Sequence, residues 1–268
     1  MTSTLKPGMR LLNDRYRLVR RLDRLADSDQ GCETWEARDD DETPFLLKAW
    51  LTDAEPNLVV RALWDRELRV LYRASSSAGA DACLLVVREA QFDRRIGAFV
   101  LVSEGPGYGT LEIALSDRRS SPWLTTSNLR QRDRRASLWK GLRRVAAAIR
   151  TLHGQQIMHR AVSPESVFLD LQDGPPSMRL GSYEWSVRVG SEVEQSPADT
   201  WSTPPEILAG KAGYTFDTDW YGFGMLAARC LVAAESWRNR EPEERRRLVF
   251  DEIGSSLILT SKERDLVR

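Results

Sequence analysis

The sequence has few of the residues that hold metal ions or cross-link small folds. Its 268 residues include 3 cysteines, far apart at Cys32, Cys83 and Cys230, and 2 histidines. This spacing excludes a zinc knuckle and a disulfide framework, and two histidines argue against a histidine-based metal site. We therefore predict no metal site of this kind.

Long apolar runs and an excess of charge are also missing. No apolar stretch approaches the roughly 18 residues of a membrane span, and the first residues lack the apolar core of a signal peptide. Basic and acidic residues number 39 each, so the net charge of zero gives no bulk attraction to nucleic acid or anionic membrane. We expect a soluble, cytoplasmic globular chain.

Lysine is rare beside arginine. Only five of the 39 basic residues are lysines, among them Lys48. This preference points to a bacterial genome rich in G+C. It also makes a lysine in a chemically suggestive position more informative.

The first part of the chain reads mostly as strands separated by polar turns. Alternation and turn residues predict strands at 15–22, 34–39, 45–50, 83–92 and 97–104. Between them, residues 58–74 predict one helix, with Leu63, Leu68, Leu71 and Tyr72 near one apolar stripe and Glu67 beside it. We assign residues 1–105 to a small β-rich lobe.

The rest of the chain reads mostly as helices. The longest predicted helix covers 129–153, with its arginines on a solvated face. Short strands are expected at 166–170 and 178–181, and further helices at 219–235 and 241–252. We assign residues 106–268 to a larger, mostly helical lobe, so the fold class is α+β.

A known family appears at residues 152–169, LHGQQIMHRAVSPESVFL. This segment resembles the catalytic loop of eukaryotic-like protein kinases, with His159, Arg160, Pro164 and Glu165 matching the pattern. The family's other landmarks follow in order along the chain: Lys48 as the third-strand lysine, Glu67 as the glutamate of the following helix, 180–186 as the Asp-Phe-Gly segment, 203–206 as the Ala-Pro-Glu segment and Asp219 as the buried aspartate.

The resemblance covers essentially the whole chain and implies a bilobal protein-kinase-like fold. Tyr183 keeps the aromatic body of the Asp-Phe-Gly phenylalanine. The family's last helix, whose arginine pairs with the glutamate at Glu206, is missing from the sequence. Either the chain is part of a longer protein, or Glu206 has another partner.

Four positions that carry phosphoryl transfer in the family are changed here. The aspartate that accepts the substrate proton is Ala161, and the nearby lysine is Ser163. At the two positions whose side chains hold magnesium in the family, this chain has Ser166 and Ser182. Magnesium prefers anionic oxygen, which a serine hydroxyl does not provide. The resemblance therefore implies a catalytically inactive member, a pseudokinase.

The nucleotide pocket also departs from the family pattern. The segment that should be glycine-rich keeps only Gly31, and Asp27 and Asp29 would repel phosphate. Leu46 and Phe168 are larger than the family's residues around adenine, and we expect them to fill that slot. The sequence thus predicts no cofactor, with neither ATP nor magnesium bound.

The framework positions are better kept. Leu71, Tyr183 and His159 are expected to stack between the lobes, and Asp219 to accept backbone hydrogen bonds from residues 158–160.

Two features near the predicted activation segment stay open. Arg160 either pairs with acidic residues between 192 and 199 or is solvated. Thr200, Ser202 and Thr203 are possible phosphorylation sites for another kinase.

The main hypothesis is an inactive kinase-like module that binds and regulates a partner. The partner would be another protein or a downstream domain of the same polypeptide, and neither nucleic acid nor membrane. One alternative is a weakly active or atypical Ser/Thr kinase that uses Glu165 or Glu184, where Glu184 is the carboxylate nearest the lost metal ligand. Another is an inactive domain that binds nucleotide as a switch.

Overall fold

The computed structural model describes most of the chain, with gaps. The described residues are 5–22, 32–52, 58–104, 109–170, 177–191, 202–231, 242–255 and 259–263. Several predictions fall outside them: Asp27, Asp29 and Gly31, the boundary between the two lobes at 105, the acidic residues between 192 and 199, and Thr200.

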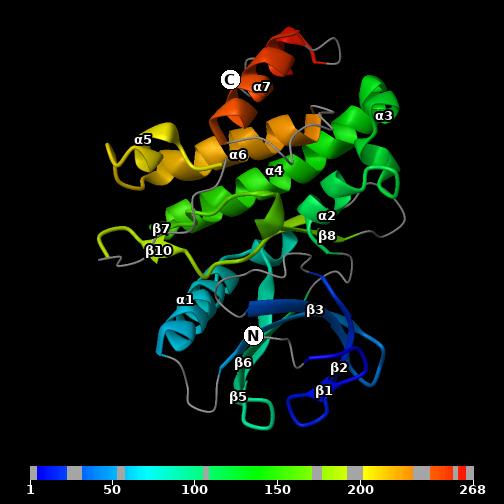
Figure 1. Ribbon diagram of the computed structural model, residues 1–268, viewed down its shortest axis with the longest axis vertical. Helices are drawn as coiled ribbons and strands as arrows, with labels where there is room; N and C mark the ends of the chain where they lie inside the picture. Colours follow the sequence, from blue (N-terminus) through cyan, green and yellow to red (C-terminus); the bar gives the residue numbers. More distant parts are fainter. Residues whose placement is uncertain are drawn as a thin grey trace.

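One end of the molecule is a six-stranded antiparallel sheet with one helix beside it (Figure 1). The strand order is β1-β2-β3-β4-β6-β5. The elements are β1 (Arg10–Leu11), β2 (Tyr16–Arg21), β3 (Cys32–Arg38), β4 (Pro44–Leu51), α1 (Leu58–Ser75), β5 (Val86–Asp93) and β6 (Ala98–Glu104), with a single 3-10 turn at Ala80–Ala82.

The central strand β4 explains where the site forms. Six of its residues in a row, from Phe45 to Trp50, are buried, because β3 and β6 flank it and both faces of the sheet are covered. Lys48 lies within this run. A buried ammonium needs carboxylate partners, so other elements must bring them to this strand.

The other end of the molecule is helical. Its helices are α2 (Leu111–Ser116), α3 (Thr126–Arg130), α4 (Arg132–Gly154), α5 (Pro205–Leu208), α6 (Phe216–Leu231) and α7 (Pro242–Ser255), with 3-10 turns at Pro122–Leu124 and Pro164–Ser166. Two short antiparallel pairs, β7 (Ile157–Met158) with β10 (Val187–Arg188) and β8 (Val167–Asp170) with β9 (Ser177–Leu180), lie between these helices and the sheet (Figure 1).

The helix α6 passes very close to the segment after β7. A Cβ atom at Gly222 would lie 2.6 Å from the backbone oxygen of Val162, so only glycine permits this approach.

The predicted α+β, two-lobed architecture is confirmed.

Two local predictions are wrong. The helix predicted over 129–153 is two helices, because Gln131 is extended, at φ −78° and ψ 124°, and separates α3 from α4. The sequence predicts Tyr72 near the apolar stripe of its helix, but it is 60% exposed. Tyr72 follows Leu63 by nine residues, which turns it half a revolution away from that buried leucine.

Within the described residues, no helix is long and apolar enough to cross a bilayer.

Candidate active site

Lys48 lies between two carboxylates that come from distant parts of the chain. Its Nζ is 2.7 Å from Glu67 Oε2 on α1 and 2.9 Å from Glu184 Oε2, which follows β9. The side chains of Lys48 and Glu67 are 4% and 2% exposed, while that of Glu184 is 20% exposed. The sheet, α1 and the segment after β9 therefore meet at one buried cation with one solvent-accessible carboxylate.

The pKa shifts of Lys48, Glu67 and Glu184 differ in direction and cause. Burial opposes the charge on Lys48, but Glu184 and Glu67 outweigh it and keep the pKa of Lys48 above its ordinary value. Burial raises the pKa of Glu67 to about 7, although Lys48 acts against the shift. Burial also acts to raise the pKa of Glu184, yet Lys48 outweighs it and the pKa lies below its ordinary value. Glu184 is thus an ionised carboxylate at neutral pH.

Asp219 at the start of α6 fixes the backbone of the predicted catalytic loop. Its Oδ2 accepts a hydrogen bond from the His159 N–H at 2.8 Å, and its Oδ1 accepts one from the Arg160 N–H at 2.7 Å. His153 Nε2 on α4 is also 2.8 Å from Oδ2. Asp219 is 1% exposed, so water does not reach this site. Its carboxylate therefore supplies the hydrogen-bond acceptor that these buried N–H groups need.

His159 is a core residue, and its ring is neutral. Its Nε2 is 2.9 Å from the Gly181 carbonyl, to which it must donate, and its Nδ1 accepts from the Ala161 N–H at 3.3 Å. Burial lowers the pKa of His159, in keeping with this tautomer. The Tyr183 ring meets it edge-on, with 5.5 Å between centroids. Leu71, also expected in this stack, is buried in the same apolar cluster as Tyr183.

The serines of the catalytic loop make local backbone contacts. Ser166 Oγ donates to the Ser163 carbonyl at 2.9 Å and accepts from the Ser163 N–H at 3.0 Å. Together with the Ser163 side chain, these bonds form a capping box at the turn Pro164–Ser166. Ser182 is partly exposed and has φ 61°, a backbone conformation that residues other than glycine adopt rarely.

The two residues expected in the adenine slot are both buried. Leu46 on β4 is 1% exposed and Phe168 on β8 is 2% exposed. A Cβ atom at Gly181 would lie 2.8 Å from Cε2 of Phe168 and would also collide with Leu85. The phenylalanine ring therefore uses space that a side chain at 181 would need.

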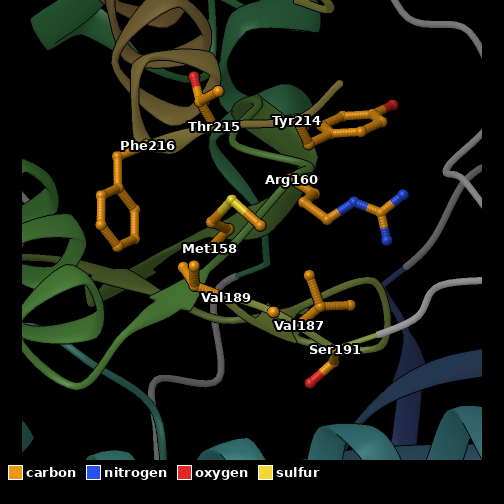
Figure 2. Close-up of a pocket in the computed structure, with 9 residues that line it drawn as sticks. Met158, Arg160, Val187, Val189, Ser191, Tyr214, Thr215 and Phe216 are labelled. Carbon is orange, nitrogen blue, oxygen red and sulfur yellow. The ribbon is translucent and has the colours of Figure 1, made fainter. Parts of the chain in front are cut away.

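Arg160 is buried against an aromatic ring, so the solvated alternative is wrong. It is 5% exposed, its guanidinium carbon is 4.3 Å from the centroid of the Tyr214 ring, and its Nη1 donates to the Trp185 carbonyl at 3.3 Å. Burial lowers its pKa. Arg160 lines a cavity of about 470 Å³. Figure 2 shows its side chain at one edge of this cavity, with Tyr214 on one side and Val187 on the other.

The end of the predicted activation segment is held by a residue that the sequence reasoning missed. Arg246 on α7 is buried, and its Nη2 donates to the Thr203 carbonyl at 3.0 Å. The arginine run in the predicted helix 241–252 was the available signal. Thr203 and Ser202 are 5% and 6% exposed, which leaves their hydroxyls poorly accessible, and Glu206 is exposed.

Comparison with known proteins identifies the family. Residues 100–266, more than half of the chain, match the model of the protein kinase domain. Similar proteins include the serine/threonine-protein kinase DCLK1 of Rattus norvegicus (27% identity, 48% of this chain and 28% of the relative) and the putative cyclin-dependent kinase F-2 of Oryza sativa subsp. japonica (23%, 70% and 50%). The Aurora kinase of Schizosaccharomyces pombe is 32% identical over 34% of this chain and 24% of the relative. The chain spans half or less of the length of each of these relatives.

These findings correct two predictions. The conclusion that the chain is not an enzyme is wrong, because the family model and several relatives named as kinases point to a protein kinase. The conclusion that it uses no cofactor is wrong for the same reason, since the family uses ATP with magnesium. The first rested on the changed positions Ala161, Ser166 and Ser182, and the second also on the altered nucleotide pocket. Neither included the contact between Glu184 and Lys48 that the fold creates.

The relatives named above are eukaryotic, so the bacterial source inferred from arginine usage is not confirmed. The ordered landmarks, the two-lobed fold and the match over residues 100–266 agree. The chain belongs to the protein kinase domain family.

Proposed function

We propose that this chain is an atypical Ser/Thr protein kinase of low activity, in which Glu184 supplies the carboxylate for the divalent cation. The observation that carries the proposal is the position of Glu184 Oε2, 2.9 Å from Lys48 Nζ and on the more exposed side of the ion cluster. The family carries its metal-binding aspartate at the position of Ser182. In this chain the carboxylate of Glu184, two residues later, would take its place.

The residues present fit a nucleotide-bound cation better than a cation held by protein alone. Magnesium commonly takes one or two carboxylates and completes its shell with phosphate oxygens and water. Among the described side chains, no group of three or more His, Cys, Asp or Glu could hold a metal. Glu184 would hold the cation, and Lys48, braced by Glu67, would contact the phosphates.

When bound, the cation neutralises charge that develops on the transferred phosphoryl group. This chain's own contribution is to position Lys48 and to keep Glu184 ionised, as the direction of its pKa indicates. At position 161 the methyl group of alanine cannot accept the proton of a substrate hydroxyl. Low activity follows, because general-base catalysis typically contributes about 10²–10⁴-fold.

The test combines binding with transfer. The thermal midpoint of the chain is measured with ATP alone, with ATP and Mg²⁺, and with ATP and Mn²⁺, and radiolabel transfer to a generic Ser/Thr substrate is followed in parallel. We expect a metal-dependent rise in the midpoint and slow transfer, both of which Glu184→Gln abolishes. The matched control is Glu243→Gln, on the exposed face of α7.

Three results would overturn the proposal. They are the absence of any ATP-induced shift, a shift that is the same without metal, and transfer that survives Glu184→Gln. The second result would favour a nucleotide-binding switch instead.

A regulatory role, a protein partner and a cytoplasmic location stay predictions beside this proposal.

A further inference from the structure

A groove of about 870 Å³ runs between the outer side of α1 and the strand β10. Arginines dominate its rim: Arg66, Arg69 and Arg73 from α1 and Arg188 from β10. The α1 arginines follow one another by three and four residues, so they line one side of the helix. We call this surface the α1–β10 groove.

Within the part of the chain that the structure describes, the positive charge of the rim is poorly balanced. Asp65 is the one acidic residue among the described residues that line the groove, and its Oδ2 is 4.0 Å from Arg69 and 3.8 Å from Arg61. No described residue forms an ion pair with Arg73 or Arg188. Arg69 is 81% exposed. Burial lowers the pKa of Arg66, and the nearby charge of Arg69 adds to this shift.

The floor of the groove is apolar. Val70, Ile157 and Val187 line it and are 7%, 2% and 8% exposed. Tyr72 stands 60% exposed at its edge. An apolar floor with a charged rim is the arrangement that holds a peptide by one buried side chain and several charged ones.

We propose that the α1–β10 groove binds an acidic peptide segment of a partner protein. An aliphatic side chain of the peptide rests on Val70 and Val187, and flanking carboxylates face Arg69, Arg73 and Arg188. The chemistry of the partner follows from charge complementarity with the rim and from the apolar floor.

The position of the groove gives binding a consequence. Arg66 faces the groove, and its Nη1 also donates to the Glu184 carbonyl at 3.1 Å. Its neighbour on α1 is Glu67, whose carboxylate contacts Lys48. A bound peptide therefore contacts the helix and the segment that place both carboxylates around Lys48.

The probe is a fluorescein-labelled peptide, Glu-Glu-Glu-Leu-Glu-Glu-Glu, titrated with the full chain at about 0.15 M salt, where exposed charges are largely screened beyond about 8 Å. Anisotropy is read without nucleotide, so the result does not depend on kinase activity. We expect saturable binding that the double variant Arg69→Glu/Arg73→Glu weakens about tenfold or more, since each exposed pair contributes up to about 1 kcal/mol and reversal adds repulsion.

The matched control reverses two exposed charges on another helix. Lys140→Glu/Arg143→Glu lies on α4 and should leave peptide affinity within about twofold, because both side chains are exposed and neither lines the groove. Thermal midpoints verify that all variants fold. A peptide with serine in place of leucine should bind several-fold more weakly, because it loses the contact with the floor.

Four results would overturn the inference: no saturable binding to the unmodified chain, equal weakening by the α4 variant, no effect of the leucine-to-serine change, or equal binding of a single-stranded oligonucleotide with the same loss in Arg69→Glu/Arg73→Glu. The last result would identify a general polyanion site.

Discussion

At the scale of single residues, the site depends on Lys48 having two carboxylates and not one. A buried ion pair that loses one member leaves an uncompensated charge, which typically costs about 3–5 kcal/mol. Removing the lysine here would leave Glu67 and Glu184 facing each other without the cation that both contact.

The first prediction concerns Lys48→Met. We expect the free energy of unfolding at pH 7 to fall by about 3–5 kcal/mol, and the double variant Lys48→Met/Glu67→Leu to recover part of the loss. The pKa of Glu67 is already about 7 beside the lysine, and removing Lys48 raises it further. A carboxyl group whose pKa is raised on folding stabilises more at low pH, so the loss should shrink as the pH falls from 7 to 5.

Urea unfolding at both pH values measures these effects. Lys140→Met removes an exposed lysine on α4 and should change stability by less than about 0.5 kcal/mol. Equal losses in Lys48→Met and Lys140→Met would contradict the prediction, as would a loss at pH 5 as large as that at pH 7.

The second prediction concerns the ring of Phe168. A Cβ atom at Gly181 would lie 2.8 Å from this ring, so Gly181→Ala should destabilise the chain by about 1–3 kcal/mol through overpacking. Phe168→Leu in the same chain removes the ring edge and should restore part of the stability. Gly154→Ala, where no atom lies within 4 Å of the new carbon, is the control. The prediction is contradicted if the thermal midpoint of the double variant falls by the sum of the two single losses. That result would show that the two positions do not compete for space.

At the scale of elements, Arg135 on α4 contacts the short stretch that follows α7. Glu263 Oε1 accepts from Arg135 Nε at 2.8 Å and from Trp139 Nε1 at 2.8 Å, and its Oε2 accepts from the Thr260 N–H at 2.8 Å. Partial burial acts to raise the pKa of Glu263, but these hydrogen bonds outweigh it and lower the pKa to about 2.

The third prediction follows from the sign of that shift. A carboxyl group whose pKa falls on folding stabilises above its unfolded pKa, and this contribution is lost as the pH drops from about 4.5 toward 2. Glu263→Gln should therefore lower stability at pH 6 and flatten its decline between pH 4.5 and 2. Urea titrations across this range measure it. An unchanged acid limb in the variant would contradict the assignment.

The elements also show what the sequence could and could not predict. The strand at 45–50 and the helix at 58–74 were recognisable because their apolar pattern is local to each segment. The contact of Glu184 with Lys48 joins residues 136 positions apart, and no local pattern encodes it. The break at Gln131 was missed because the helical pattern continues across it.

At the scale of the whole molecule, one apolar core joins the sheet to the helices. A single cluster of buried side chains includes Trp50 from β4, Leu71 from α1, Tyr183 from the segment after β9, and Leu152 and Leu226 from α4 and α6. A second cluster contains only residues between 5 and 102. The continuity of the first cluster implies that the two lobes unfold together, although chains of this length often populate intermediates.

The last prediction tests that continuity through Leu47, which belongs to the second cluster and is fully buried. Leu47→Ala should cost about 2–5 kcal/mol, since it leaves a cavity in the core. Leu47 packs within the second cluster alone. If the lobes form one cooperative unit, the urea concentration at which α6 unfolds should nevertheless fall as far as that at which β3 unfolds. Hydrogen exchange of peptides from both elements, followed across a urea series, measures the two midpoints. Leu58→Ala, at a side chain 78% exposed, should move neither. A lower midpoint for β3 with α6 unchanged would mean that the shared core is too weak to couple the lobes, because the sheet would then unfold while the helices stay packed.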